Sequence, residues 1–74
     1  IGHDCEIGNY FTSAPGVKIS GNCKIRDLVY IGTNASIKEK VTISSLVTIG
    51  LNCGVVKDIK EPGIYVGTPA KKIN

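Results

Sequence analysis

The chain has 74 residues and a net charge of +3, from nine Lys and Arg against six Asp and Glu. A chain this short forms one small domain and needs a metal, disulfides or partner subunits to complete a sizeable core. The positive charge is spread along the sequence and no apolar run is long enough to cross a membrane, so we expect neither a nucleic-acid nor a membrane partner and a cytoplasmic location.

A six-residue period runs from Ile1 to Val55. Every sixth residue is aliphatic except Ser13, and the residue two places before each later member is apolar. Such apolar, outward, apolar triplets predict three-residue β-strands, whereas a six-residue step on an α-helix would turn the side chain by about 240° each time. Three strands then close a triangular coil of 18 residues. The columns predicted for two of the three faces are Ile1, Ile19, Ile37 and Val55, and Ile7, Ile25 and Ile43.

The residue after each column member is often small, which predicts a bend there, as at Gly2 and Gly8. The three cysteines, Cys5, Cys23 and Cys53, fall on inward positions and contain no CxxC pair. Cys5 and Cys23 lie one coil apart, so a disulfide between them is conceivable, but packed free thiols are the preferred interpretation.

The period stops after Val55, which predicts a solenoid over residues 1–59 and a capping tail over residues 60–74. Pro62-Gly63 indicates a turn, and residues 64–66 form one more candidate strand. The chain begins without Met and inside a repeat, from which we expect an upstream segment.

His3 is the only histidine, and it is followed by Asp4. It is a candidate catalytic group, a candidate metal ligand or a polar residue in a surface turn. A zinc site of three histidines is not available from one histidine, so no metal is expected. Adjacent side chains point apart in a regular strand, so His3 and Asp4 can act together only if the chain bends between them.

The six-residue repeat, the opening "HDCEIG" and the closing "VGTPAKKI" resemble the hexapeptide-repeat acetyltransferases, in particular the sialic acid O-acetyltransferase and nucleotide-amino-sugar N-acetyltransferase family. The resemblance implies an all-β fold, a left-handed parallel β-helix of about three coils with a C-terminal capping tail. It also implies a homotrimer, acetyl-CoA as co-substrate and a sugar or nucleotide-sugar as acetyl acceptor. The family's N-terminal nucleotide-sugar-binding domain is expected outside these 74 residues.

The resemblance further implies roles for single residues. His3 matches the general base, Asp4 the acid that orients it, and Gly21 the backbone donor to the developing oxyanion. Thr12 stands where the family has a second histidine near the thioester. The residues implied to bind the cofactor are Thr12, Gly32, Thr33, Gly50 and Leu51 along the pantetheine arm, Gly67, Pro69 and Ala70 at the adenine end, and Lys71 and Lys72 at the phosphates.

Two other functions fit the same repeat. One is a non-catalytic scaffold subunit that uses its flat faces for assembly, and the other is a serine-type O-acetyltransferase. Neither the acceptor nor the choice between N- and O-acetylation follows from the sequence.

Overall fold

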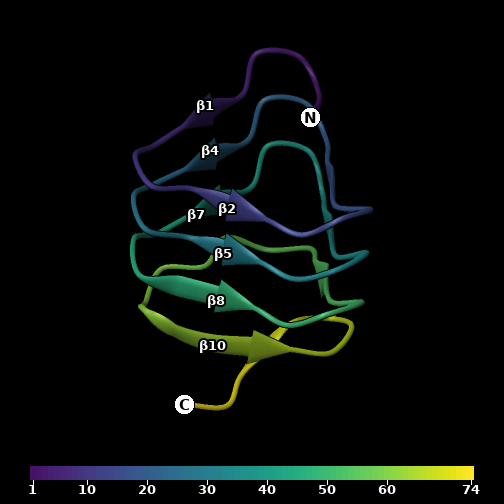
Figure 1. Ribbon diagram of the computed structural model, residues 1–74, viewed down its shortest axis with the longest axis vertical. Helices are drawn as coiled ribbons and strands as arrows, with labels where there is room; N and C mark the ends of the chain where they lie inside the picture. Colours follow the sequence, from purple (N-terminus) through teal and green to yellow (C-terminus); the bar gives the residue numbers. More distant parts are fainter.

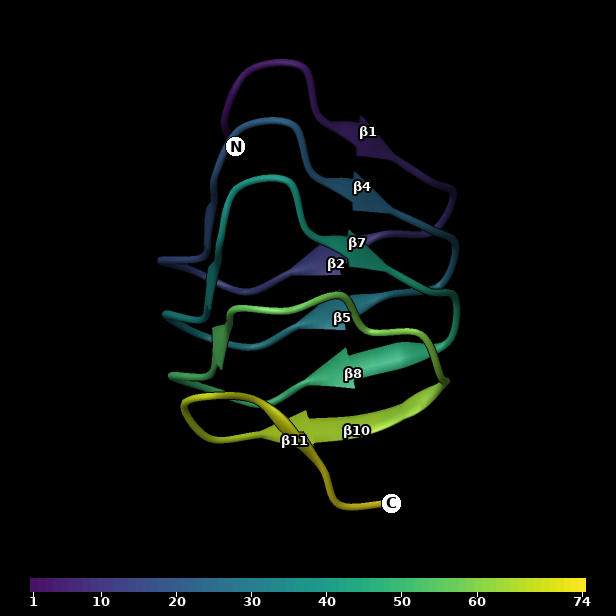
Figure 2. The same ribbon diagram turned by 180° about the vertical axis from the view of Figure 1, so that it is seen from behind.

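The computed structural model describes all 74 residues and shows a chain wound into stacked triangular coils (Figures 1 and 2). Short strands alternate with turns, and no helix is present that is long and apolar enough to cross a membrane. The strands are β1 (Glu6–Ile7), β2 (Thr12–Ser13), β3 (Lys18–Ile19), β4 (Lys24–Ile25), β5 (Tyr30–Ile31), β6 (Ser36–Ile37), β7 (Thr42–Ile43), β8 (Val47–Ile49), β9 (Gly54–Val55), β10 (Gly63–Val66) and β11 (Lys71–Lys72).

The strands form three sheets, one for each side of the triangle. Sheet A has the order β1-β4-β7, sheet B the order β11-β10-β8-β5-β2, and sheet C the order β3-β6-β9. Neighbours one coil apart pair in parallel and 18 residues apart, as in Ile7↔Ile25 and Ile25↔Ile43. The parallel solenoid and the columns predicted from the period are therefore confirmed, and the left hand of the coil is what the resemblance implies.

The strands and bends differ from the prediction in detail. Most strands have two residues, because the first apolar residue of each triplet precedes the paired segment. The left-handed residue of each turn stands three places after the column member, and not one place after it as predicted. These turn residues have φ between 54° and 78°, and they are Asp4, Tyr10, Gly16, Asn22, Leu28, Asn34, Lys40, Leu46 and Asn52.

The glycines after the columns serve close packing between coils and not the bend. A Cβ on Gly32 would lie 2.8 Å from the backbone nitrogen of Leu51, on the coil below. A Cβ on Gly8 would lie 2.7 Å from the carbonyl carbon of Arg26. Neither glycine has a positive φ, so the reason for glycine at these positions is space.

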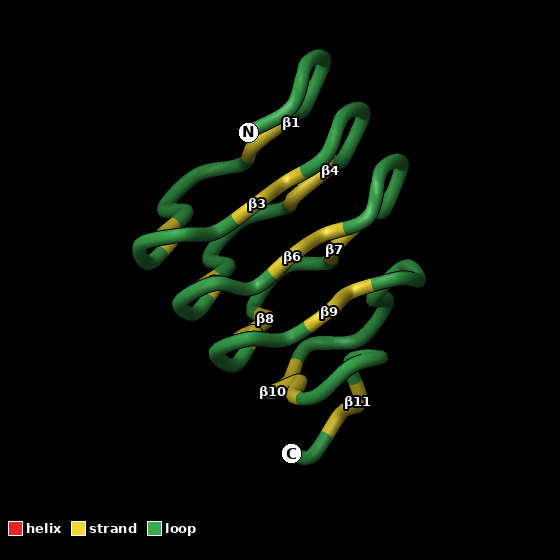
Figure 3. Tube along the Cα trace, turned by 90° about the vertical axis from the view of Figure 1, so that its right-hand side faces the viewer, coloured by secondary structure: helices red, strands yellow, loops and turns green.

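The turns stack into three corners, which we name by one residue each. The His3 corner joins sheets C and A and comprises residues 3–4, 21–22 and 39–40. The Leu28 corner joins sheets A and B and comprises residues 9–10, 27–28 and 45–46. The Thr33 corner joins sheets B and C and comprises residues 15–16, 33–34 and 51–52. In Figure 1 the Leu28 corner forms the left-hand edge, and in Figure 3 sheet C faces the viewer.

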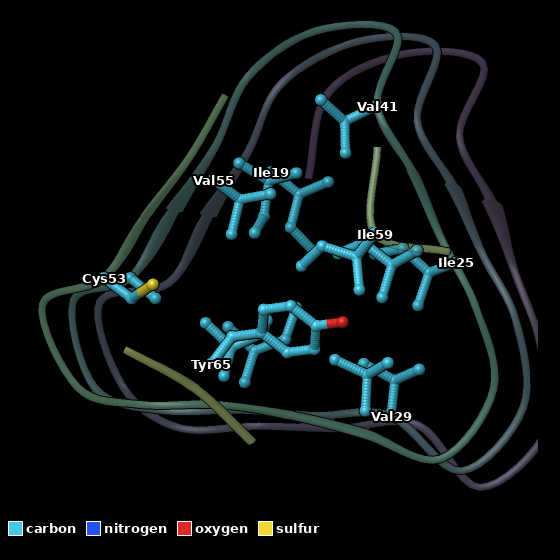
Figure 4. Close-up of a cluster of buried hydrophobic side chains, with 14 of the residues drawn as sticks. Ile19, Ile25, Val29, Val41, Cys53, Val55, Ile59 and Tyr65 are labelled. Carbon is cyan, nitrogen blue, oxygen red and sulfur yellow. The ribbon is translucent and has the colours of Figure 1, made fainter. Parts of the chain in front are cut away.

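The core fills the middle of the triangle with one aliphatic or cysteine side chain after another (Figure 4). Cys23 and Cys53 are buried, Cys5 is half-buried, and all three thiols are free, as expected. The first coil is open, because Ile1 is 75% and Ile7 36% exposed. Stacking thus buries the second and third coils far better than the first.

The tail continues the stack before it turns back. β10 pairs in parallel with β8, with Gly63↔Val47 and Tyr65↔Ile49, so the coil is here 16 residues long. The parallel stack therefore extends to Val66 and does not end near residue 59. β11 then pairs antiparallel with β10, a hairpin that the six-residue pattern does not predict.

Candidate active site

The His3 turn holds an imidazole and a carboxylate against each other. Asp4 has φ 58°, and this left-handed turn lets two adjacent side chains meet, with Nδ1 of His3 3.1 Å from Oδ2 of Asp4. A carboxylate oxygen only accepts, so in this pair Nδ1–H donates and Nε2 carries the lone pair. The two side chains are 80% and 79% exposed, so Nε2 is available to a ligand.

Gly21 lies directly beside the imidazole, one coil further along the axis. The N–H of Asn22 donates to the carbonyl oxygen of His3 over 2.9 Å, which fixes the two turns together. A Cβ on Gly21 would lie 3.3 Å from Nε2 of His3. The N–H of Gly21 itself donates no hydrogen bond. A free proton acceptor and a free hydrogen-bond donor therefore stand side by side.

The Thr33 corner also presents unused backbone donors. The N–H groups of Thr33 and Leu51 donate no hydrogen bond, and the two turns are linked because Asn52 N–H donates to the Thr33 carbonyl over 2.8 Å. At the Leu28 corner, by contrast, side chains satisfy such groups: Asn9 N–H donates to Oδ1 of Asp27 over 2.7 Å. The free N–H groups of the Thr33 corner are thus available to an external acceptor.

The three glycines implied to line the cofactor are explained by the packing of the coils. Gly32 is buried against Leu51, and a Cβ on Gly50 would lie 2.9 Å from Cγ1 of Val66. Gly67 has φ 87°, and its carbonyl accepts the N–H of Gly54 over 3.1 Å. Close approach between coils is therefore sufficient reason for these glycines.

A hollow of about 330 Å³ opens at the lower end of the solenoid. Pro69, Ala70 and Lys71 line it, as three of the residues implied to bind the adenine end and the phosphates. Lys72 does not line it and lies 3.9 Å from Oε1 of Glu61. The sequence analysis missed the remaining lining residues, because they belong to no motif and follow the break in the period; they are Val56, Lys57, Asp58, Ile59 and Tyr65.

The structure separates the predicted site residues into two groups. His3, Asp4 and Gly21 meet at the His3 corner, whereas Thr33 and Leu51 lie at the Thr33 corner, and the strands of sheet C run between the two. Thr12 belongs to neither, since it lies exposed on β2 in sheet B opposite Tyr30. No group of three or more His, Cys, Asp or Glu side chains is arranged to hold a metal ion.

Comparison of the sequence with curated proteins finds acyltransferases, although no protein-family profile matches the chain. A GDP-perosamine N-acetyltransferase of Escherichia coli O157:H7 is 51% identical over 41 residues, which are 55% of this chain and 19% of that protein. A probable mitochondrial UDP-3-O-acylglucosamine N-acyltransferase 2 of Arabidopsis thaliana is 36% identical over all 74 residues, 24% of its length. A serine acetyltransferase of Bacillus licheniformis is 32% identical over 81 residues, covering 99% of this chain and 38% of that protein.

Solved structures give the same assignment. WeeI from Acinetobacter baumannii AYE superimposes with a TM-score of 0.92 at 38% identity, over 99% of this chain and 37% of that chain. PerB from Caulobacter crescentus, solved with CoA and GDP-perosamine, superimposes with a TM-score of 0.86 at 24% identity, over 96% of this chain and 34% of that one. The fold and these relatives define a β-helix of the acyltransferase type. The chain belongs to the hexapeptide-repeat sugar acetyltransferase family and spans between 19% and 38% of the length of the relatives given above.

Proposed function

We propose that this solenoid is the catalytic part of an acetyltransferase that moves an acetyl group from acetyl-CoA to an amino or hydroxyl group of a bacterial sugar or nucleotide-sugar. The observation that carries the proposal is the pairing of His3 with Asp4 at 3.1 Å, which leaves Nε2 free beside the unused N–H of Gly21. A general base and an oxyanion donor are the two groups that acyl transfer from a thioester needs.

His3 and Gly21 have distinct parts in the proposed step. The acceptor's amine or hydroxyl gives its proton to Nε2 of His3 as its nitrogen or oxygen bonds to the thioester carbonyl carbon. The C–S bond then breaks, and the departing thiolate takes the proton back from the imidazolium. Gly21 N–H donates to the carbonyl oxygen while it carries negative charge. A positioned base contributes about 10²–10⁴-fold and one oxyanion donor about 10²–10³-fold.

Acetyl-CoA fits the residues of the Thr33 corner and the lower hollow. The N–H groups of Thr33 and Leu51 can donate to the amide carbonyls of a pantetheine arm. The hollow combines the apolar atoms of Pro69 and Ala70 with the cations of Lys57 and Lys71, a combination that suits a phosphorylated adenosine. The structure of PerB with CoA shows that a related solenoid is found with this molecule.

A homotrimer belongs to the same proposal. The base and the proposed pantetheine donors occupy different corners of one chain, so the site is completed when the His3 corner of one copy meets the Thr33 corner of the next. A domain that binds the nucleotide-sugar, upstream of these residues, is proposed from the family and agrees with the greater length of the relatives. Location in the cytoplasm is proposed for the same reason of family.

Two other functions stay in view. The serine acetyltransferase relative supports an enzyme with the same solenoid and a different acceptor. A non-catalytic scaffold would share the repeat and would not bind acetyl-CoA. The GDP-perosamine N-acetyltransferase relative, at 51% identity over its matched part, favours an amino-sugar nucleotide.

The test is a transfer assay on the longer protein that carries this solenoid, with acetyl-CoA and a panel of nucleotide-linked amino-sugars, sialic acid and serine. Acetylation of a sugar supports the proposal. Acetylation of serine alone would replace the acceptor class, and the absence of both acetyl transfer and a thermal shift with acetyl-CoA would favour the scaffold.

A further inference from the structure

The Leu28 corner carries a row of exposed apolar side chains, one from each coil. Tyr10 is 80% exposed, Leu28 52% and Leu46 60%. The corresponding turn residues are Asp4, Asn22 and Lys40 at the His3 corner, and Gly16, Asn34 and Asn52 at the Thr33 corner. Only the Leu28 corner therefore has bulky apolar residues at the left-handed position.

This row is costly to the isolated chain. Tyr10, Leu28 and Leu46 have φ of 58°, 57° and 60°. The left-handed conformation costs a bulky residue roughly 1–2 kcal/mol, whereas glycine and, to a lesser degree, asparagine adopt it readily. Water-exposed leucine gains nothing that offsets this cost within one chain, so the strain points to a role outside it.

The sheet that begins at this corner is the only uncharged one. The outward residues of the parallel strands of sheet B are Thr12, Tyr30, Thr48 and Ile64. Sheets A and C instead present charged residues, among them Glu6 and Lys24 on sheet A and Lys18 on sheet C. Depletion of charge together with exposed tyrosine is typical of the centre of a protein–protein interface.

We infer that the row of Tyr10, Leu28 and Leu46 and the outer face of β2, β5, β8 and β10 form the surface through which this chain binds further copies of itself. In Figure 1 this face is turned to the viewer, with the row along its left-hand edge. The inference deepens the homotrimer part of the proposed function and does not depend on its chemistry.

The spacing of the row favours a second copy over an unrelated partner. Its side chains repeat once per coil, at the strand spacing of about 4.8 Å. Another solenoid of the same coil presents rows and grooves at that same spacing, so every side chain of the row meets an equivalent groove. A standard interface buries roughly 800 Å² on each partner. The chain exposes 4459 Å² in all, so one of its three sides has enough area.

The position of the row is also compatible with the site. The Leu28 corner lies opposite sheet C, and sheet C joins the His3 and Thr33 corners. Contact through the row leaves both of these corners at the outside of the assembly, where acceptor and donor can reach them.

Sedimentation of the double variant Leu28→Asn, Leu46→Asn tests the inference. Asparagine suits the left-handed turn, so the fold is retained, as circular dichroism can check, while the apolar contact is lost. We expect the wild type to sediment as a trimer and the variant to associate at least about tenfold more weakly. Val56→Asn is the matched control, because Val56 is 45% exposed, follows β9 on sheet C and should leave association unchanged.

A monomeric wild type, or a double variant that associates as tightly as the wild type, would overturn the inference. If the double variant fails to fold, the single substitution Tyr10→Asn serves instead, with the same two results deciding. Because no substrate is present, association through the row together with absent acetyl transfer would uphold this inference and contradict only the proposed chemistry. Association that the row variants leave intact would do the reverse.

Discussion

At the scale of single residues, the His3 turn owes its geometry to a left-handed aspartate. A carboxylate that orients a histidine typically changes activity by about 10–100-fold when it is removed. Asp4→Asn tests this without breaking the turn, because asparagine also tolerates φ near 58°. We expect kcat to fall about 10–100-fold with an unchanged melting temperature. An unchanged kcat would show that Asp4 serves only the turn.

The buried thiols make stability depend on alkaline pH. Burial raises the pKa of Cys23 and of Cys53 above the usual range, because a thiolate would lose its hydration. A group with a raised pKa in the folded state contributes fully below its unfolded pKa, near 8.5, and the contribution is lost as pH rises toward the folded value. We therefore expect the free energy of unfolding to decline above about pH 8.5.

Denaturant unfolding at pH 7 to 10.5 measures this effect under reducing conditions. The variant Cys23→Ala, Cys53→Ala should be less stable at pH 7 but should lose less of its stability across the alkaline range. Parallel pH profiles for variant and wild type would show that other groups cause the decline.

At the scale of elements, glycine separates the coils where their backbones approach most closely. Gly32→Ala would place a Cβ 2.8 Å from the Leu51 nitrogen, and such overpacking costs about 1–3 kcal/mol. Gly21→Ala meets only the end of the His3 ring at 3.3 Å, so it should leave stability nearly unchanged while it displaces the imidazole. Thermal unfolding of the two variants compares them, and equal melting temperatures would contradict the account.

Tyr65 ties the last coil to the rest of the solenoid. Its ring is 92% buried beneath Ile49, since only 8% of the residue is exposed, and its hydroxyl donates to the Glu61 carbonyl over 2.8 Å. Tyr65→Ala should cost about 3–5 kcal/mol, and Tyr65→Phe about 1 kcal/mol through the lost hydrogen bond. Chemical denaturation measures both, and a larger loss for phenylalanine than for alanine would exclude this packing role.

Sequence reasoning recovers the repeating elements and fails where the repeat ends. The columns through Ile7 and Ile19 follow from the period, because inward side chains must recur once per strand. The position of the left-handed turn residue was misplaced, since small residues after the columns reflect contact between coils that a sequence does not display. The β10–β11 hairpin and the part that Lys57 has in the hollow depend on a 16-residue last coil, for which no motif stands.

At the scale of the whole molecule, each corner of the triangle has its own chemistry. The His3 corner carries the base and a free N–H, the Thr33 corner carries further free N–H groups, and the Leu28 corner carries exposed apolar side chains. The motif around His3 was evident from the sequence, and the structure adds its neighbour Gly21 in space. Assembly of copies is therefore central to the proposed function, because one chain holds the two halves of the site at separate corners.

The most direct test compares acetyl transfer by the wild type and by His3→Ala, in the longer protein, with acetyl-CoA affinity measured on both. His3 lies exposed at a turn and supports no buried contact, so the variant should fold normally. The account predicts that turnover falls by about 10²–10⁴-fold while the affinity for acetyl-CoA stays within a few fold of the wild type. Undiminished turnover by His3→Ala would contradict it.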